Sequence, residues 1–197
     1  MQYLKHDVKE NIIKAALAEF IEKGYQDSSM RIIARNANIV MGNIYRYFDN
    51  KEALFNALMG PVYDQIAGTC EKVQHEIEEL QGPWEDEQAM TLIKQTYEQI
   101  LKNVSGRGME LLILLDKSGG SRYEGTKKEL IEQIRNILEI RLLPEMHEKD
   151  VFILYVVASA FVEGICVILR ECGDHDRREA LIGSLSTIML CQISKRV

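Results

Sequence analysis

The sequence has little of what marks a polypeptide without a stable fold. Only 3 of its 197 residues are proline and 13 are glycine, while 46% are apolar. This composition excludes a disordered, collagen-like or low-complexity chain. The four cysteines form no CxxC pair, and no charged-then-apolar signal profile is present at the N-terminus. We therefore expect a reduced, cytoplasmic protein whose core needs neither disulfides nor a metal.

Long apolar runs are also scarce. The longest one, from Val151 to Leu169, nearly reaches the roughly 20 residues that a bilayer-spanning helix needs. Glu163 lies inside it, and a carboxylate is costly in the hydrocarbon core. A buried helix is favoured over a membrane span, so no membrane is expected among the partners.

The chain has no overall excess of positive charge. Its formal net charge is -6, which argues against a protein coated in nucleic acid over its whole surface. The charge is uneven, because residues 1–60 hold 8 basic and 7 acidic side chains and residues 61–197 hold 16 and 23. Between Ser28 and Lys51 only Asp49 opposes four basic residues, so a local basic face remains open.

Helical spacing of apolar residues dominates the whole sequence, and no run alternates cleanly enough to predict a strand. The predicted fold is all-α. A first helix is expected to begin near Asp7, with Glu10 reaching back, and to end at Gly24. A second helix, capped by Ser28 or Ser29, carries an apolar stripe formed by Met30, Ile33, Ala34 and Ala37.

A third helix is expected directly after the second. Asn38 tolerates a left-handed turn, and the third helix spans residues 40–48. Asp49 or Asn50 then caps a fourth helix that begins at Lys51. Two short helices joined by a turn of three to four residues make a helix-turn-helix, whose second helix enters the major groove of DNA.

The helical period predicts which side chains of the third helix face DNA. At about 100° per residue, one side, directed at the core, carries Val40, Ile44, Tyr47 and Phe48. The other side carries Gly42, Asn43, Tyr45 and Arg46. Spacing alone leaves open that this side is merely a solvated surface.

The outward side chains suit DNA chemically. Arg46 can donate two hydrogen bonds to guanine or hold a phosphate, Asn43 can pair with adenine or phosphate, and Tyr45 offers a phenol to phosphate. Gly42 permits close approach of the backbone. At the starts of neighbouring helices, Ser29, Arg31 and Lys51 are expected to bind phosphates.

Residues 8–58 closely resemble the N-terminal domain of the TetR/AcrR family of bacterial transcriptional regulators. The resemblance rests on an Ala-Ala-Leu-x-x-Phe helix, a Glu-Lys-Gly-Tyr turn, Ser-Met-Arg-x-Ile-Ala, Gly-Asn-Ile-Tyr-Arg-Tyr-Phe and Asn-Lys-Glu-Ala-Leu. It implies that family positions used on operator DNA are occupied here by Ser29, Arg31, Gly42, Asn43, Tyr45, Tyr47 and Lys51. Arg46 is the main candidate for sequence readout.

The sequence departs from the family pattern at two places. Where the family usually has Ser-Lys-Gly, this chain has Val40-Met41-Gly42, and Asn38 stands where Gly is usual. Without a lysine at Met41, one phosphate contact is lost, and the salt dependence of binding is expected to flatten by about one unit of slope.

The resemblance implies a DNA-binding domain at residues 1–50 and a larger helical domain at residues 51–197 that senses a ligand and dimerises, giving about nine helices in all. The apolar last two helices need a partner, and small residues allow helices to approach closely. The residues expected at the dimer interface are Phe161, Gly164, Leu181, Leu185, Ile188 and Met189.

The ligand site is less well defined. The residues expected to line an apolar cavity are Tyr97, Met109, Tyr123, Tyr155 and Glu163, although aromatics at helical spacing are more often plain core. Glu163 either neutralises a cationic or amine-bearing ligand, or it pairs with Arg170 or caps a neighbouring helix across the dimer interface. No cofactor is expected, because no phosphate loop with a preceding strand is found. No metal site is expected either, because no cluster has familiar ligand spacing.

The reading that accounts for most of these features is a homodimeric, ligand-responsive regulator, more specifically a repressor, with double-stranded DNA, a second copy and a small-molecule effector as partners. A helical small-molecule-binding module that has lost specific DNA binding is the alternative. An enzyme ranks last, because no nucleophile, base or cofactor loop is recognisable.

Overall fold

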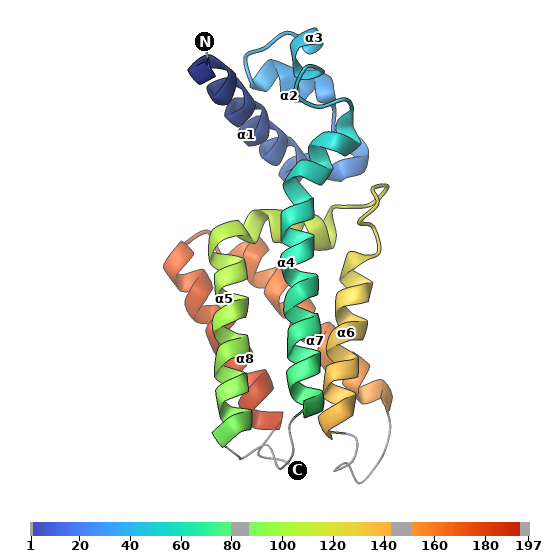
Figure 1. Cartoon of the computed structure of the whole chain (residues 1–197), viewed down its shortest axis with the longest axis vertical. Helices are drawn as coiled ribbons and strands as arrows, with labels where there is room; N and C mark the ends of the chain where they lie inside the picture. The colour runs from blue at the N-terminus through green and yellow to red at the C-terminus, as the bar shows by residue number, and fades with distance from the viewer. Residues whose placement is uncertain (1, 80–86, 143–150, 194–197) are drawn as a thin grey trace. The chain divides into compact units, whose positions relative to one another are not determined.

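The structure, a computed structural model, describes residues 2–79, 87–142 and 151–193. These residues form helices and no strand, which confirms the all-α fold (Figure 1). In chain order the helices are α1 (Gln2–Asp27), α2 (Met30–Asn36), α3 (Met41–Ile44), α4 (Lys51–Glu79), α5 (Glu87–Asp116), α6 (Thr126–Leu142), α7 (Val151–Glu171) and α8 (His175–Ile193). Two of them, α1 and α5, contain a break with non-helical backbone angles.

The helices belong to two compact units. The N-terminal unit comprises Met1–Tyr63 together with Met109–Gly125, and the C-terminal unit comprises Asp64–Gly108 and Thr126–Val197. Both α4 and α5 therefore contribute to both units. In α5 the change of unit follows Arg107, whose φ of -144° and ψ of 34° break the helix. The boundaries of these compact units differ from the domain boundary predicted after residue 50. That boundary, which was drawn by function, stays a prediction.

The core of the N-terminal unit is built on aromatic side chains. Phe20 and Phe55 are fully buried and meet edge to face, with ring centroids 4.9 Å apart. Tyr123 lies 6.2 Å from Phe55 and 5.4 Å from Tyr63, measured between ring centroids, and is only 6% exposed. The segment after Met109 thus completes this core.

Helix α1 differs from its prediction at its start. It begins at Gln2 and not near Asp7, because the residues before Asp7 continue the helix and no cap is required there. Its end agrees with the prediction. Gly24 has φ 72° and ψ 176°, a conformation that only glycine adopts readily, and the regular helix breaks at this residue.

The turn after α2 agrees with the sequence prediction. Asn38 has a φ of 57° and supplies the left-handed residue. Its N–H donates to the carbonyl of Arg35 at 3.1 Å, and the N–H of Ile39 donates to the carbonyl of Ala34 at 3.0 Å. This pair of bonds is a Schellman motif, which satisfies the last carbonyls of α2 and fixes the direction of the chain into α3.

Helix α4 begins as predicted. The side-chain oxygen of Asn50 accepts a hydrogen bond of 2.7 Å from the N–H of Ala53, so Asn50 caps the helix. Leu54, Phe55 and Met59 follow on one buried stripe. Pro61 lies inside the helix.

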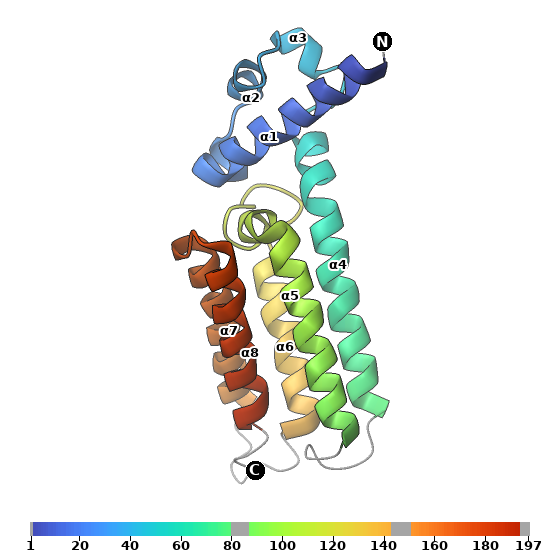
Figure 2. The same ribbon diagram turned by 90° about the vertical axis from the view of Figure 1, so that its left-hand side faces the viewer.

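In the C-terminal unit, α6 packs against α7 and α7 against α8 (Figure 2). The approach of α7 to α8 is close at Gly164, where an added Cβ atom would lie 2.9 Å from Cδ2 of Leu185. By length and composition α7 is the one described helix that could span a membrane. The expected burial holds for one of its faces, which carries Leu154, Ala158, Phe161, Val162, Ile165, Cys166 and Leu169. Its other face is exposed.

Candidate nucleic-acid interface

The element expected to enter DNA is shorter than predicted. Helix α3 covers Met41–Ile44, and one further turn continues it. In that turn the N–H groups of Tyr47 and Phe48 both donate to the carbonyl of Ile44, at 3.0 Å and 3.1 Å. We refer to residues 40–48 as the recognition element.

Two apolar side chains fix the recognition element to its unit. Ile44 is fully buried and Phe48 is 7% exposed, as predicted. The prediction for Val40 is wrong, because its side chain is 76% exposed. Val40 precedes the helix and has extended backbone angles, φ -73° and ψ 148°, so an angular count based on helical geometry does not apply to it.

The outward face of the recognition element carries Gly42, Tyr45 and Arg46, all exposed. Asn43 and Tyr47 are half-buried beside them. Gly42, Tyr45 and Arg46 thus lie on the predicted side, whereas Asn43, predicted outward, and Tyr47, predicted inward, both lie between core and surface.

Helix α2 adds positive charge. Arg31 and Arg35 are one helical turn apart and both exposed. In the part of the chain that the structure describes, neither these two side chains nor Arg46 forms an ion pair. Three guanidinium groups therefore remain available to an anionic partner.

The start of α2 is stabilised differently from the prediction. Ser29 is the N-cap residue, but its side chain makes no capping hydrogen bond. Its backbone N–H instead donates to Oε1 of Glu19 on α1, at 3.0 Å, and the hydroxyl of Ser28 donates to the carbonyl of Tyr25 at 2.7 Å. Glu19 is a buried carboxylate that sequence reasoning missed, because its partner is remote along the chain and no local pattern indicates it.

Lys51 was expected to bind a phosphate, but its ammonium group is directed at backbone carbonyls of its own unit. Its ammonium group donates to the carbonyls of Tyr25, Gln26 and Ser28, at 2.6, 3.0 and 3.1 Å. It also lies 4.6 Å from the centroid of the Tyr25 ring. All three donors of the ammonium are thus in use at the end of α1, where free carbonyls favour a cation. Burial lowers the pKa of Lys51, and Asp27 opposes this effect.

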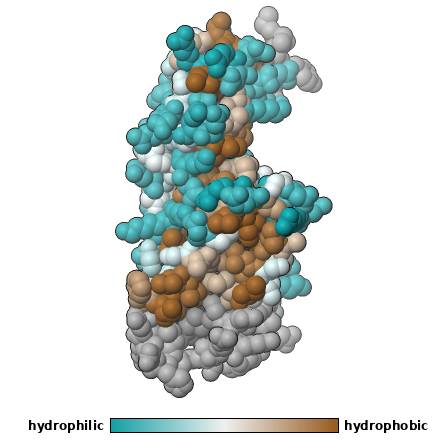
Figure 3. All heavy atoms as spheres, turned by 180° about the vertical axis from the view of Figure 1, so that it is seen from behind, coloured by the Kyte–Doolittle hydropathy of each residue, from teal (hydrophilic) through white to brown (hydrophobic). Residues whose placement is uncertain are grey.

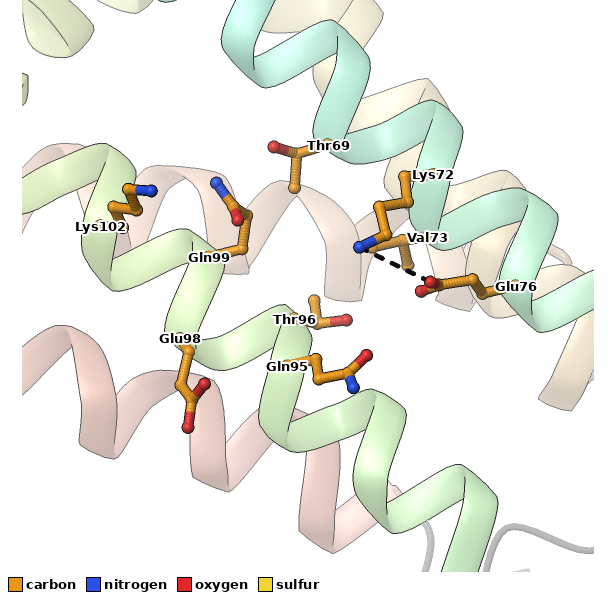
Figure 4. A pocket seen from close by; sticks show the side chains of 9 residues that line it. All are labelled: Thr69, Lys72, Val73, Glu76, Gln95, Thr96, Glu98, Gln99 and Lys102. Carbon is orange, nitrogen blue, oxygen red and sulfur yellow. Dashed lines mark ion pairs between the residues drawn. The ribbon is translucent and has the colours of Figure 1, made fainter.

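A polar groove lies between α4 and α5 in the C-terminal unit (Figure 4). Its volume is about 330 Å³, within the range of small-molecule sites. Lys72 and Glu76 face each other at 3.7 Å on the α4 side. The lining residues are Thr69, Lys72, Val73, Glu76, Gln95, Thr96, Glu98, Gln99 and Lys102.

Of the residues expected to bind a ligand, the four whose side chains the structure describes do not line this groove. Met109 and Tyr123 belong to the N-terminal unit, whereas Tyr155 and Glu163 lie on α7. The side chain of Tyr97 lies outside the described residues. Glu163 pairs with Lys127 at 2.6 Å and with Arg170 at 3.6 Å, so it is the ion-paired carboxylate of the two alternatives considered.

The residues expected at the dimer interface fall into two groups. Phe161 is 7% exposed and Leu185 packs on Gly164, so these three lie between helices of one protomer. Leu181 and Ile188 of α8 are 38% and 56% exposed, and Met189 is half-buried. Sequence reasoning did not assign the exposed apolar residues of α7 to the interface; they are Phe152, Ile153, Val156 and Val167.

Viewed from behind, apolar side chains form a broad band on the C-terminal unit (Figure 3). We call the exposed apolar side chains of its last two helices the α7/α8 face, made of Phe152, Ile153, Val156, Val167, Leu181 and Ile188. Exposed apolar side chains in such number on two neighbouring helices are typical of a contact with another molecule.

Comparison with known proteins identifies the N-terminal region. Residues 12–58 match the family model described as bacterial regulatory proteins, tetR family. The uncharacterized HTH-type transcriptional regulator YuxN of Bacillus subtilis is 26% identical over 82% of this chain, and the match covers 53% of YuxN. The chain thus spans about half the length of this curated relative. The HTH-type transcriptional repressor KstR of Mycolicibacterium smegmatis is 33% identical over 29% of this chain and 28% of its own length.

The fold is shared more widely than the sequence. A crystal structure of a TetR-family transcriptional regulator from Bordetella parapertussis superimposes with a TM-score of 0.66 at 21% identity. The match covers 93% of this chain and 94% of the other. At this identity the likeness concerns the fold alone. All of these matches are named as transcriptional regulators, a non-enzymatic class of protein that agrees with the expectation from the sequence.

Proposed function

We propose that this chain, whose residues 12–58 match the family model described as bacterial regulatory proteins, tetR family, is a repressor of that family that binds a pseudo-palindromic operator as a homodimer and is released by a small molecule. A bacterial protein with this function works in the cytoplasm, where the chromosome lies. The proposal has three parts, namely DNA contact, dimerisation and release.

The proposed DNA contact is supported mainly by the exposed basic and polar side chains of α2 and the recognition element. Arg31 and Arg35 present positive charge on α2, and the recognition element presents the neutral phenol of Tyr45 and the charged guanidinium of Arg46. Phosphate contacts position a protein on DNA, and a guanidinium directed into the major groove reads guanine. We assign Arg46 to base readout, and phosphate or backbone contacts to Ser29, Arg31, Gly42, Asn43, Tyr45 and Tyr47. Lys51 is left out, because its donors are occupied.

The α7/α8 face supports dimerisation. Two copies that join through it bury exposed side chains such as Phe152 and Ile188, each of which stabilises a complex when removed from water. A two-fold dimer presents two recognition elements to DNA. Binding two half-sites on one side of the duplex requires a separation of about 34 to 36 Å between these elements.

Release requires a ligand that prefers the state unable to bind DNA. To lower occupancy from about 99% to about 1%, that preference must reach roughly 5.5 kcal/mol. The groove between α4 and α5 is the described cavity that supports an effector site, and its amide, hydroxyl and charged side chains favour a small polar molecule. Helices α4 and α5 each contribute to both units, so a change in the groove alters elements that also build the DNA-binding unit.

The deciding experiment is selection of bound sequences from a random duplex pool with the full chain, repeated at two salt concentrations. We expect an inverted repeat to be enriched, and binding to weaken as salt rises, since phosphate contacts release counterions. Arg46→Ala is expected to weaken binding about 10-fold to 100-fold and to relax the preference at one base pair of each half-site. Lys128→Ala on α6, an exposed lysine of the C-terminal unit, serves as the matched control and leaves binding unchanged.

A pool that returns no enriched sequence at either salt concentration contradicts the proposal. That result favours the alternative, a helical module that keeps the fold and binds a small molecule without specific DNA recognition. The replacement of the usual lysine by Met41 is the sequence feature that motivates this alternative.

A further inference from the structure

Exposed apolar side chains of the N-terminal unit are concentrated in one place. Among the residues that the structure describes there, the large apolar side chains that are exposed are Val40, Met41 and Tyr45, at 76%, 37% and 44%. All three lie in the recognition element. At the end of the N-terminal unit where α3 lies, brown atoms stand among teal ones (Figure 3).

The unit itself covers these side chains only in part. Ile44 and Phe48 already fill the core beneath the recognition element. Val40 is the extended residue before α3, and Met41 is the first residue of that helix. Both side chains therefore lie at the N-terminal end of α3, just after the turn from α2. A valine side chain offers no hydrogen bond, and a thioether is only a weak acceptor, so neither suits a phosphate.

The major groove offers one kind of apolar group on its base edges. Thymine displays its 5-methyl group there, whereas adenine, guanine and cytosine display only hydrogen-bond donors and acceptors. Apolar side chains distinguish thymine through contact with this methyl group. The stiff, branched side chain of valine and the adaptable side chain of methionine both suit such a contact.

We propose that Val40 and Met41 are specificity-determining residues that contact thymine 5-methyl groups in the operator, next to the base pair read by Arg46. This inference rests on the proposed DNA binding and adds the chemistry of the half-site. Positions 40 and 41 then contribute sequence preference and no phosphate contact.

The test removes the methyl group without altering the protein. After selection of the operator, each thymine is replaced in turn by deoxyuridine, which lacks only that methyl, and affinity is measured by fluorescence anisotropy with the full-length wild-type chain. We expect one or two thymines of each half-site to lose about fourfold in affinity on replacement, the value of one buried methyl group. Putting cytosine at such a position weakens binding, and 5-methylcytosine restores part of the loss.

Variants then assign the contact to a side chain. Val40→Ala or Met41→Ala is expected to bring the ratio of thymine to uracil affinity close to one at the position that the residue reads. Met41→Leu, which keeps an apolar side chain of similar volume, preserves the ratio. Both positions are exposed, so these substitutions leave the core unchanged.

Two results overturn the inference. If the chain selects an operator but every uracil substitution is neutral, or if both alanine variants keep the wild-type ratio, Val40 and Met41 do not read methyl groups, and the proposed DNA binding still stands. If no sequence is selected at all, both the inference and the proposed function fail. The two failures are thus distinguished by the selection itself.

Discussion

The backbone N–H of Tyr25 donates a hydrogen bond of 2.8 Å to the carbonyl oxygen of Lys117. The ammonium group of Lys117 in turn donates to the carbonyl of Ile21. Two groups of one residue thereby hold the last turns of α1. Between these contacts lies Gly24, at which an added Cβ atom would be 3.3 Å from the same Lys117 oxygen.

Replacement of Gly24 by alanine is expected to lower the free energy of unfolding by about 1 to 3 kcal/mol. The backbone angles there are nearly exclusive to glycine, and the new methyl group presses on a backbone oxygen. Thermal unfolding followed by circular dichroism measures the effect. Gly68→Ala in α4, where nothing lies within 4 Å of the new atom, is the matched control and should be neutral or mildly stabilising. Equal midpoints for the two variants would contradict the strain at Gly24.

Lys51→Met is expected to destabilise the N-terminal unit by about 1 to 3 kcal/mol. The change leaves the carbonyls of Tyr25, Gln26 and Ser28 without their charged donor. Denaturant unfolding with Lys23→Met as control measures the loss, because Lys23 pairs only with exposed Glu22 at the surface.

The same variant separates a structural role of Lys51 from a phosphate contact. Well below its unfolding temperature, Lys51→Met should keep the wild-type slope of log affinity against log salt. A slope that becomes shallower by about 0.9 would show that Lys51 neutralises a phosphate and would refute the structural assignment.

Ile188→Glu is expected to convert the proposed dimer into a monomer. The side chain is 56% exposed in the protomer, so a carboxylate there is solvated in the monomer but buried without a partner in a paired α7/α8 face. Light scattering after size-exclusion chromatography gives the mass. Ile188→Val, which keeps the surface apolar, should remain dimeric. A dimer that persists in Ile188→Glu places the interface elsewhere.

Cys70 is expected to react slowly with thiol reagents in the folded protein. Burial, with a smaller effect of Glu71, raises the pKa of its thiol to about 11. At pH 8 the thiolate fraction is then about two-hundredfold smaller than in the unfolded chain, where the pKa is near 8.5. Alkylation by iodoacetamide, measured on the peptide by mass spectrometry with and without urea, tests this.

The same shift sets a pH dependence of stability. Because the pKa is raised on folding, the contribution of Cys70 is fully present below about pH 8.5 and is lost as the pH rises toward 11. Equal alkylation rates for the folded and urea-unfolded chains would contradict the burial of this thiol.

Much of the N-terminal unit could be predicted from local sequence. The apolar stripe of α2, the left-handed Asn38 and the cap at Asn50 all depend on residues within a few positions of one another, and the structure confirms each of them. The inward positions Ile44 and Phe48 followed from the helical period in the same way.

The remainder depends on contacts between distant residues. Glu19 binds the start of α2, and Lys51 binds the end of α1, through hydrogen bonds across 10 and 23 to 26 positions, which no local pattern reveals. Val40 was misplaced because the angular count treated a non-helical residue as helical. Three of the five residues expected to bind a ligand were aromatic, and one of these, Tyr123, is part of the aromatic core of the N-terminal unit.

The aromatic core of the N-terminal unit has a consequence for protein engineering. Tyr123 packs on Phe55 and Tyr63, so a fragment that ends at residue 63 would expose those two rings to solvent. The fragment would also lose the hydrogen bond between the N–H of Tyr25 and the carbonyl of Lys117. A hybrid protein that joins this N-terminal unit to the ligand-binding domain of another protein must therefore include residues 109–125 as a second inserted segment.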